Sequence, residues 1–165
     1  MRPLTATTCR RLDIQGFDQV DDLTLAAVAP WLRFAFAGCA LMAGVGTAMA
    51  SPTILLALVP LAALAALFPV HPFDLLYNHG IRFVTKTGPL PHRGAPSRFA
   101  CGLGAVWLLV VAWAFRSGHP LVGYTLGGVL TGVAVLVSTV DVCIPSLVYR
   151  SVFGFPPPRG PAPSR

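Results

Sequence analysis

Residues 99–115 read FACGLGAVWLLVVAWAF and contain no charged side chain. An α-helix rises about 1.5 Å per residue, so about 20 apolar residues cross the ~30 Å hydrocarbon core of a bilayer. Three further apolar stretches accompany this one, at residues 26–50, 53–69 and 121–149. The sequence therefore predicts an all-α integral membrane protein built as a bundle of four transmembrane helices.

The positive charges flank these stretches unevenly. If all four stretches cross the membrane, the N-terminal arm, the loop at residues 70–98 and the C-terminal tail lie on one side. That side then carries ten of the twelve lysines and arginines: Arg2, Arg10, Arg11, Arg82, Lys86, Arg93, Arg98, Arg150, Arg159 and Arg165. The other side has only Arg116, and Arg33 falls within the first stretch. Because lysine and arginine accumulate in cytoplasmic loops, we expect both termini in the cytoplasm.

The second stretch is short for a transmembrane helix, and Pro60 removes a backbone hydrogen-bond donor from its middle. A re-entrant hairpin is the alternative. With three spans, however, the flanking cations would divide four to seven between the two sides, which is far less polarised than ten to one. The charge distribution therefore favours four spans, and it leaves open whether Pro60 kinks the second helix or breaks it.

This pattern divides the chain into a cytoplasmic N-terminal arm at residues 1–25, a membrane domain at 26–150 and a Pro-rich cytoplasmic tail at 151–165. From Phe155 we expect the tail to be disordered unless a partner holds it. Arginine outnumbers lysine eleven to one, which is typical of GC-rich bacterial genes and predicts a bacterial inner (plasma) membrane. The net charge of +6 follows from the topology, and no basic run alternates with aromatic residues, so no nucleic-acid partner is expected.

Two sets of residues recur at helical spacing in the loop after residue 70. The apolar set is Phe73, Leu76, Tyr77, Gly80, Phe83 and Val84, and the polar set is Asp74, Asn78, Arg82 and Lys86. A helix with two such faces lies in the headgroup layer with its basic end near anionic lipid. Alternatively, its apolar face packs on the bundle or on a partner subunit. We predict an amphipathic interfacial helix in the cytoplasmic loop between the second and third transmembrane helices.

Small residues mark the expected helix contacts. Gly123 and Gly127 form one ridge of the last stretch, and Gly128 and Gly132 form another. Membrane helices associate where small residues allow their backbones to approach closely. The sequence leaves open whether these ridges join helices within one chain or between chains.

Asp141 and Arg33 are the charged residues inside the apolar stretches. Each lies about eight residues from the expected cytoplasmic end of its helix, so the two are at equal depth. Because charges in lipid are tolerated when they pair, we predict a structural ion pair between them. Two alternatives are open. Arg33 could extend to the interface while Asp141 faces a polar pocket, or Asp141 could serve a proton or ion pathway.

The sequence predicts no metal site and no cofactor. The four cysteines include no Cys-x-x-Cys pair, as zinc knuckles and dithiol redox sites require. The four histidines (His71, His79, His92 and His119) all lie in connections or at helix ends, which argues against a haem held between membrane helices. His71 and His79 are two helical turns apart, too far to share one ion without other ligands.

The segment DVCIPSLVY at residues 141–149 is the most unusual local sequence. Pro145 leaves the carbonyl of Asp141 without its helical partner, and we expect it to kink the last helix. The thiol of Cys143 and the hydroxyl of Ser146 would then lie near this carbonyl and form a candidate thiol site. Alternatively, the helix simply bends to end at the interface, anchored by Tyr149 and Arg150.

Two short motifs resemble a known family. PSRFA at residues 96–100 opens the third apolar stretch, and CIPSLVY at residues 143–149 closes the fourth. The chain is similar in these segments to the bacterial membrane family catalogued as domain of unknown function 4395, whose members tend to carry Pro-x-Arg-Phe-Ala and Cys-x-x-Cys-x-x-Tyr. The resemblance implies a membrane fold. Ser146 replaces the second cysteine of the family pattern, so it leaves Cys143 as the single thiol there.

These features predict a non-catalytic membrane protein, an accessory subunit or interaction partner of a larger inner-membrane complex, with lipid and protein partners. The alternative is a thiol protein in which Cys143 exchanges with a cytoplasmic redox partner. A position near a helix C-terminus and beside an acid would raise the pKa of Cys143, which counts against that alternative. A third possibility is a small carrier or lipid-binding protein that uses Asp141.

Overall fold

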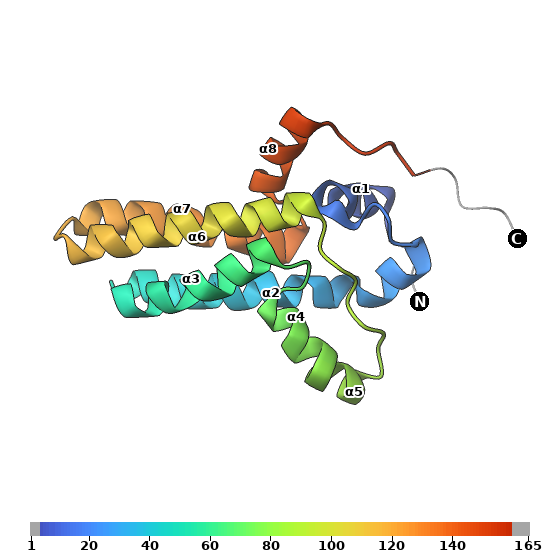
Figure 1. Cartoon of the computed structure of the whole chain (residues 1–165), viewed down its shortest axis with the longest axis horizontal. Helices are drawn as coiled ribbons and strands as arrows, with labels where there is room; N and C mark the ends of the chain where they lie inside the picture. Colours follow the sequence, from blue (N-terminus) through green and yellow to red (C-terminus); the bar gives the residue numbers. More distant parts are fainter. Residues whose placement is uncertain (1–3, 160–165) are drawn as a thin grey trace, which may run out of the picture.

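The computed structural model describes residues 4–159, and within that range the chain forms helices and connecting segments without strands. Four apolar helices lie side by side: α2 (Asp22–Ala48), α3 (Pro52–Leu67), α6 (Ala95–Arg116) and α7 (Pro120–Val140) (Figure 1). Three of them, α2, α6 and α7, are long and apolar enough to cross a membrane. The predicted all-α, membrane-compatible architecture is therefore confirmed. Arg2 and Arg165 lie outside the described residues.

Helix α3 is the shortest of the four. It reaches the length and apolarity of a span only together with the helical segment at residues 72–85, which bends away from it by 84°. Pro60 lies inside α3, and the helix continues past it to Leu67. Pro60 therefore does not break this helix, which answers the question that the sequence left open.

The four helices pack as two close pairs, α3 with α6 and α2 with α7. The core of this bundle consists of apolar side chains, among them Leu55 and Leu58 of α3 and Val111 of α6. One polar contact joins the pairs: the indole Nε1 of Trp107 donates a hydrogen bond to the backbone carbonyl of Leu126, at 3.0 Å. The bundle is therefore held mainly by apolar packing.

Two of the four predicted packing glycines lie in tight contacts. A Cβ on Gly123 would lie 2.6 Å from the ring of Phe115, and one on Gly127 would lie 2.6 Å from the Cγ2 of Thr47. Gly128 and Gly132 are exposed, and a Cβ on either would meet no atom within 4 Å. Only the Gly123–Gly127 ridge therefore packs inside the chain.

We expect Gly127→Ala to lower the free energy of unfolding by about 1–2 kcal/mol, because the new methyl group must displace the buried Thr47 side chain. Gly128→Ala is the matched control one residue away. We expect it to raise the free energy of unfolding by up to about 1 kcal/mol, because alanine is the better helix former. The measurement is an SDS titration in mixed micelles followed by tryptophan fluorescence. Equal effects of the two substitutions would contradict the packing.

The last apolar stretch does not form the single kinked helix expected for residues 121–149. Helix α7 ends at Val140, Asp141 adopts a left-handed backbone conformation (φ 57°), and a separate helix α8 (Ile144–Phe153) follows. Pro145 occupies the first turn of α8, where its missing N–H has no helical partner to lose. The break therefore precedes the proline, and α8 leaves the axis of the bundle (Figure 1).

The N-terminal arm folds against the end of the bundle as helix α1 (Ala6–Leu12) and the π-helical turn η1 (Asp13–Phe17). The tail, for which disorder is expected from Phe155, instead docks on this arm within residues 155–159. The guanidinium of Arg159 bonds to Asp13 at 2.5 and 2.9 Å and to Asp22 at 2.5 Å. The physical reason is the acidic arm, which supplies carboxylates to the tail. Residues 160–165 lie outside the described range.

The predicted amphipathic helix is continuous over α4 (Pro72–Leu76), the π-helical turn η2 (Tyr77–Ile81) and α5 (Arg82–Thr85). Its two faces, however, differ from the prediction. Asp74 and Tyr77 are buried against the protein, whereas Phe83 and Val84 are exposed. Residue spacing assigned Asp74 to the wrong face of the helix, because spacing cannot reveal that Asp74 has a cationic partner inside the protein.

The remaining members of the predicted interfacial set divide between these two faces. Leu76 is 56% exposed, and Lys86 is exposed and ends α5 in a left-handed conformation. Arg82 is half-buried, with its guanidinium 4.7 Å from the centre of the Phe83 ring. Phe73 packs edge-on against Phe34 of α2, so it belongs to the bundle and not to an outer surface.

Candidate functional site

A fully buried ion pair holds the connector after α5 against the bundle. Nε and Nη2 of Arg93 donate hydrogen bonds to the Asp74 carboxylate at 2.6 and 2.8 Å. The side chains are 1% and 3% exposed. The guanidinium also lies 4.9 Å from the centre of the Phe36 ring, while its Nη1 has no hydrogen-bond partner.

Sequence reasoning missed this pair. It placed Asp74 on the polar face of a surface helix and counted Arg93 only among the cytoplasmic cations. The sequence offered one signal, the position of Asp74 three residues after His71. An acidic side chain at this spacing can cap the start of a helix. In the structure the Asp74 carboxylate accepts a hydrogen bond from the backbone N–H of His71 at 3.3 Å.

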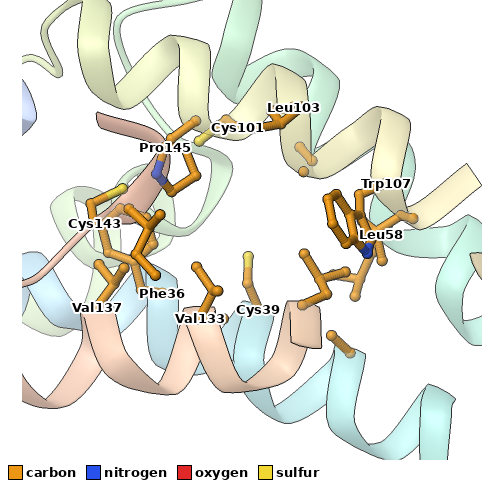
Figure 2. A pocket seen from close by; sticks show the side chains of 18 of the residues that line it. Phe36, Cys39, Leu58, Cys101, Leu103, Trp107, Val133, Val137, Cys143 and Pro145 are labelled. Atoms are coloured by element: carbon orange, nitrogen blue, oxygen red, sulfur yellow. The ribbon is translucent and has the colours of Figure 1, made fainter. Parts of the chain in front are cut away.

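A cavity of about 380 Å³ lies next to this ion pair, between α2, α3, α6 and α7, and is bounded at one end by α8 (Figure 2). Its wall is almost entirely apolar, with Phe36, Leu58, Trp107, Val133 and Val137 among the side chains that Figure 2 labels. Its volume is within the range of about 300–1,000 Å³ typical of small-molecule sites. The cavity is therefore large enough to hold a ligand.

Three cysteines from three different segments line this cavity: Cys39 of α2, Cys101 of α6 and Cys143 before α8 (Figure 2). His71 is the one titratable side chain besides them in the lining, and its Nε2 lies 3.9 Å from the Sγ of Cys39. In the described part of the chain, no three His, Cys, Asp or Glu side chains are placed to hold a metal ion. Buried thiols of this kind pack as soft, apolar groups, and these three form part of the cavity wall.

The predicted thiol site at Cys143 and Ser146 lies at the edge of this cavity. Cys143 is the residue before the first turn of α8, so it is near a helix N-terminus and not near a C-terminus as expected. Burial nevertheless raises the pKa of the Cys143 thiol, although hydrogen bonds from Ser146 act in the opposite direction. Ser146 is fully buried, and its hydroxyl donates to the Pro96 carbonyl at 3.3 Å.

Arg33 of α2 and Asp141, the residue that follows α7, lie together. Nε of Arg33 donates to Oδ1 of Asp141 at 2.8 Å, and Nη2 bonds to Oδ2. Gln15 of the arm donates to the backbone carbonyl of Asp141 at 2.9 Å. Neither Arg33 nor Asp141 lines the cavity, so their contacts join α2, α7 and the arm and do not contribute to a binding site.

The arrangement can bind but offers few groups for catalysis. A reaction of acyl or phosphoryl transfer needs a nucleophile with a base beside it, or a converging set of charged groups. The cavity has one thiol next to a base, Cys39 at 3.9 Å from His71, and otherwise presents apolar side chains, with no charged side chain among its lining residues. Such a surface favours an apolar molecule through the hydrophobic effect.

Comparison with known proteins identifies one family. The family model described as Domain of unknown function (DUF4395) matches residues 29–153, which include most of α2 and all of α3, α6, α7 and α8. No curated protein and no solved structure matches the chain. The match covers the cavity, the buried ion pair and both motifs noted in the sequence, and the chain therefore belongs to the family of Domain of unknown function (DUF4395).

Proposed function

We propose that this protein is a membrane-embedded binding protein that holds an apolar molecule in the cavity between its four long helices. The observation that carries the proposal is the cavity itself, about 380 Å³ in volume and lined by apolar side chains and thiols. A concave site of this size with a mostly apolar wall is the usual form of a small-molecule binding site.

The same proposal places the bundle across a bacterial inner membrane with four spans and both termini in the cytoplasm. Many side chains on the outside of the bundle are large and apolar, including Leu41, Trp113 and Leu121, at 63–79% exposed. Such a surface fits a lipid environment. The distribution of lysine and arginine supports the orientation.

The segment α4–η2–α5 is proposed as an interfacial helix. Its exposed apolar side chains are Leu75, Leu76, Phe83 and Val84, and it ends at Lys86. In Figure 1 it leaves the bundle at a steep angle, close to the same end as α8. A helix in this position can bury its apolar face among lipid chains while its cations meet anionic headgroups.

The other functions expected from the sequence gain less support. Cys143 is 4% exposed and its pKa is raised, both of which hinder exchange with a cytoplasmic protein. The carboxylate of Asp141 is occupied by Arg33, which does not favour a carrier that uses it. The role as an accessory subunit of a larger complex stays a prediction.

The test is to fill the cavity and look for loss of a bound molecule. Val133→Trp places a large side chain at the cavity wall, and Val135→Trp places the same side chain on the exposed outside of the same helix. Each protein is purified gently, and apolar molecules are extracted with organic solvent and quantified by mass spectrometry. We expect a near-stoichiometric molecule in the wild type and in Val135→Trp, and at least a tenfold loss in Val133→Trp.

A second measurement on the wild type avoids dependence on the folding of a variant. N-ethylmaleimide reacts with the thiolate and is apolar enough to enter the cavity, so at alkaline pH an occupant should slow its reaction with Cys39 and Cys101. Cys9, in α1 and outside the cavity lining, is the internal control. If no molecule co-purifies and removal of lipid leaves the labelling of Cys39 and Cys101 unchanged relative to Cys9, the proposal is wrong.

A further inference from the structure

The cavity has an exposed edge. Four of its lining side chains are also 40–51% exposed at the protein surface: Leu103, Val129, Ile144 and Val148. They belong to α6, α7 and α8, whereas the lining residues of α2 and α3 are buried or half-buried, with Leu58 at 2% and Ala43 at 4% exposed. The most exposed border of the cavity, between α6, α7 and α8, is therefore its lateral mouth.

The mouth is located along the bundle by the helix contacts. At the far end, α6 and α7 meet closely, where Gly123 contacts Phe115 and Trp107 donates to the Leu126 carbonyl. At the near end, α8 replaces the continuation of α7, because the chain turns at Asp141. The break after α7 therefore creates the gap that α8 borders, so the turn at Asp141 is the reason that the cavity has a mouth at this end.

Helix α8 extends the apolar surface of the mouth outward. Ile144, Val148 and Val152 recur every four residues and so lie on one face of the helix. The first two line the cavity, and Val152 lies beyond it and is 71% exposed. The opposite side is held by the protein: Ser146 donates to the Pro96 carbonyl, and Arg150 donates to the Ile14 carbonyl at 3.3 Å.

We infer that the occupant is an acyl chain of a membrane lipid, which reaches the cavity sideways through the mouth between α6, α7 and α8. This inference rests on the proposed function and names its ligand class and its route. The mouth opens on the lipid-compatible flank of the bundle and carries no charged side chain among its lining residues. A chain already dissolved in the bilayer therefore loses no polar hydration when it enters.

The shape of the cavity fits part of one chain. Its α7 wall extends from Val129 to Val137, eight residues apart, which corresponds to about 12 Å along the helix axis. The thiols of Cys39 and Cys101 lie in its wall and present no charge to a hydrocarbon. A lipid headgroup has no comparable polar pocket among the lining residues, so the headgroup stays outside at the interface, where α8 lies.

The test uses a photoreactive lipid. The protein is reconstituted in vesicles of phosphatidylcholine and phosphatidylglycerol that contain a phosphatidylcholine with a diazirine in the middle of one acyl chain. After irradiation, adducts are located by mass spectrometry of peptides. We expect adducts on the cavity-lining residues of α6 and α7 in the wild type, and at least a tenfold decrease in Val148→Asp, because a carboxylate at the mouth opposes passage of the chain.

Ser151→Asp is the matched control, since it adds the same charge to the exposed surface of α8 away from the cavity lining. We expect it to keep the wild-type adducts. Leu103→Trp closes the mouth without a charge and should reproduce the loss, which separates blockage from misfolding. Circular dichroism and a single elution peak verify the fold of each variant.

Three results would overturn the inference. Cavity adducts that persist in both Val148→Asp and Leu103→Trp would show that the chain takes another route. Adducts confined to outward residues such as Leu109 and Val135 would show that lipid chains stay outside. If a diazirine fatty acid added to detergent-solubilised protein labels the cavity while the lipid does not, the lipid source is wrong but the proposed binding function remains.

Discussion

Asp74→Ala is expected to lower the free energy of unfolding by about 3–5 kcal/mol, because it leaves the Arg93 guanidinium charged and unpaired in the interior. Both hydrogen bonds from Arg93 to the carboxylate are short, at 2.6 and 2.8 Å, and Nη1 of Arg93 has no partner in the native protein. The remaining bond from Nη2 to the Leu32 carbonyl is long, at 3.5 Å. An SDS titration in mixed micelles, followed by tryptophan fluorescence, measures this loss.

Asp18→Ala provides the control for this experiment. It removes an ion pair with Arg150 whose side chains are 29% and 15% exposed, so we expect a loss of at most about 1 kcal/mol. The double variant Asp74→Leu/Arg93→Met should recover most of the stability, because it removes both charges together. Equal losses for Asp74→Ala and Asp18→Ala would show that the buried pair is not a special contributor.

The Asp74–Arg93 pair also matters for the proposed ligand site. The backbone N–H of Arg93 donates to the Pro69 carbonyl at 2.8 Å, so the connector, the end of α3 and the start of α4 meet at this pair. Because His71 lies in the same turn and lines the cavity, loss of Asp74 should disturb the cavity wall. The Asp74→Ala protein is therefore expected to bind the ligand more weakly even under conditions in which it remains folded.

Gly94→Ala is expected to destabilise the protein by about 2–3 kcal/mol, the upper range for overpacking. A Cβ on Gly94 would lie 2.5 Å from the carbonyl oxygen of Gly16 and 2.8 Å from its Cα. Both are backbone atoms, so no side-chain rotation relieves the clash, and the arm must move away from the start of α6. The same SDS titration measures this effect.

Gly88→Ala is the control within the same connector, because a Cβ at Gly88 would meet no atom within 4 Å. We expect its free energy of unfolding to stay within about 0.5 kcal/mol of the wild type. Limited proteolysis adds an independent readout, since displacement of the arm by Gly94→Ala should expose the connection before α2. A Gly94→Ala protein as stable and as protease-resistant as Gly88→Ala would contradict the close approach of the two backbones.

The membrane-compatible character was predictable because it depends on composition over long windows. Helices α2, α6 and α7 lie within or largely overlap apolar stretches that the sequence defines, and the family match confirms the resemblance carried by the PSRFA and CIPSLVY motifs. The proximity of Arg33 and Asp141 was also accessible, because two opposite charges at equal depth in apolar helices have few other partners.

The helix at residues 72–85 was predictable only in part. Its existence follows from the spacing of its apolar residues, but the face that it buries depends on Arg93, nineteen residues away from Asp74. The break at Asp141 was missed for a related reason. The arm contributes to this turn, with Gln15 bonding to the Asp141 carbonyl and Arg11 to the Val140 carbonyl, and no local pattern encodes contacts so distant in sequence.

The sequence by itself determined that this chain forms apolar helices of membrane-spanning length and which family it belongs to. These properties are sums over many residues and need no knowledge of how the helices meet. Only the tertiary structure decided which side chains surround the cavity and where it opens. A cavity wall and a lipid-facing surface have the same apolar composition, so they differ only in the positions of the neighbouring helices.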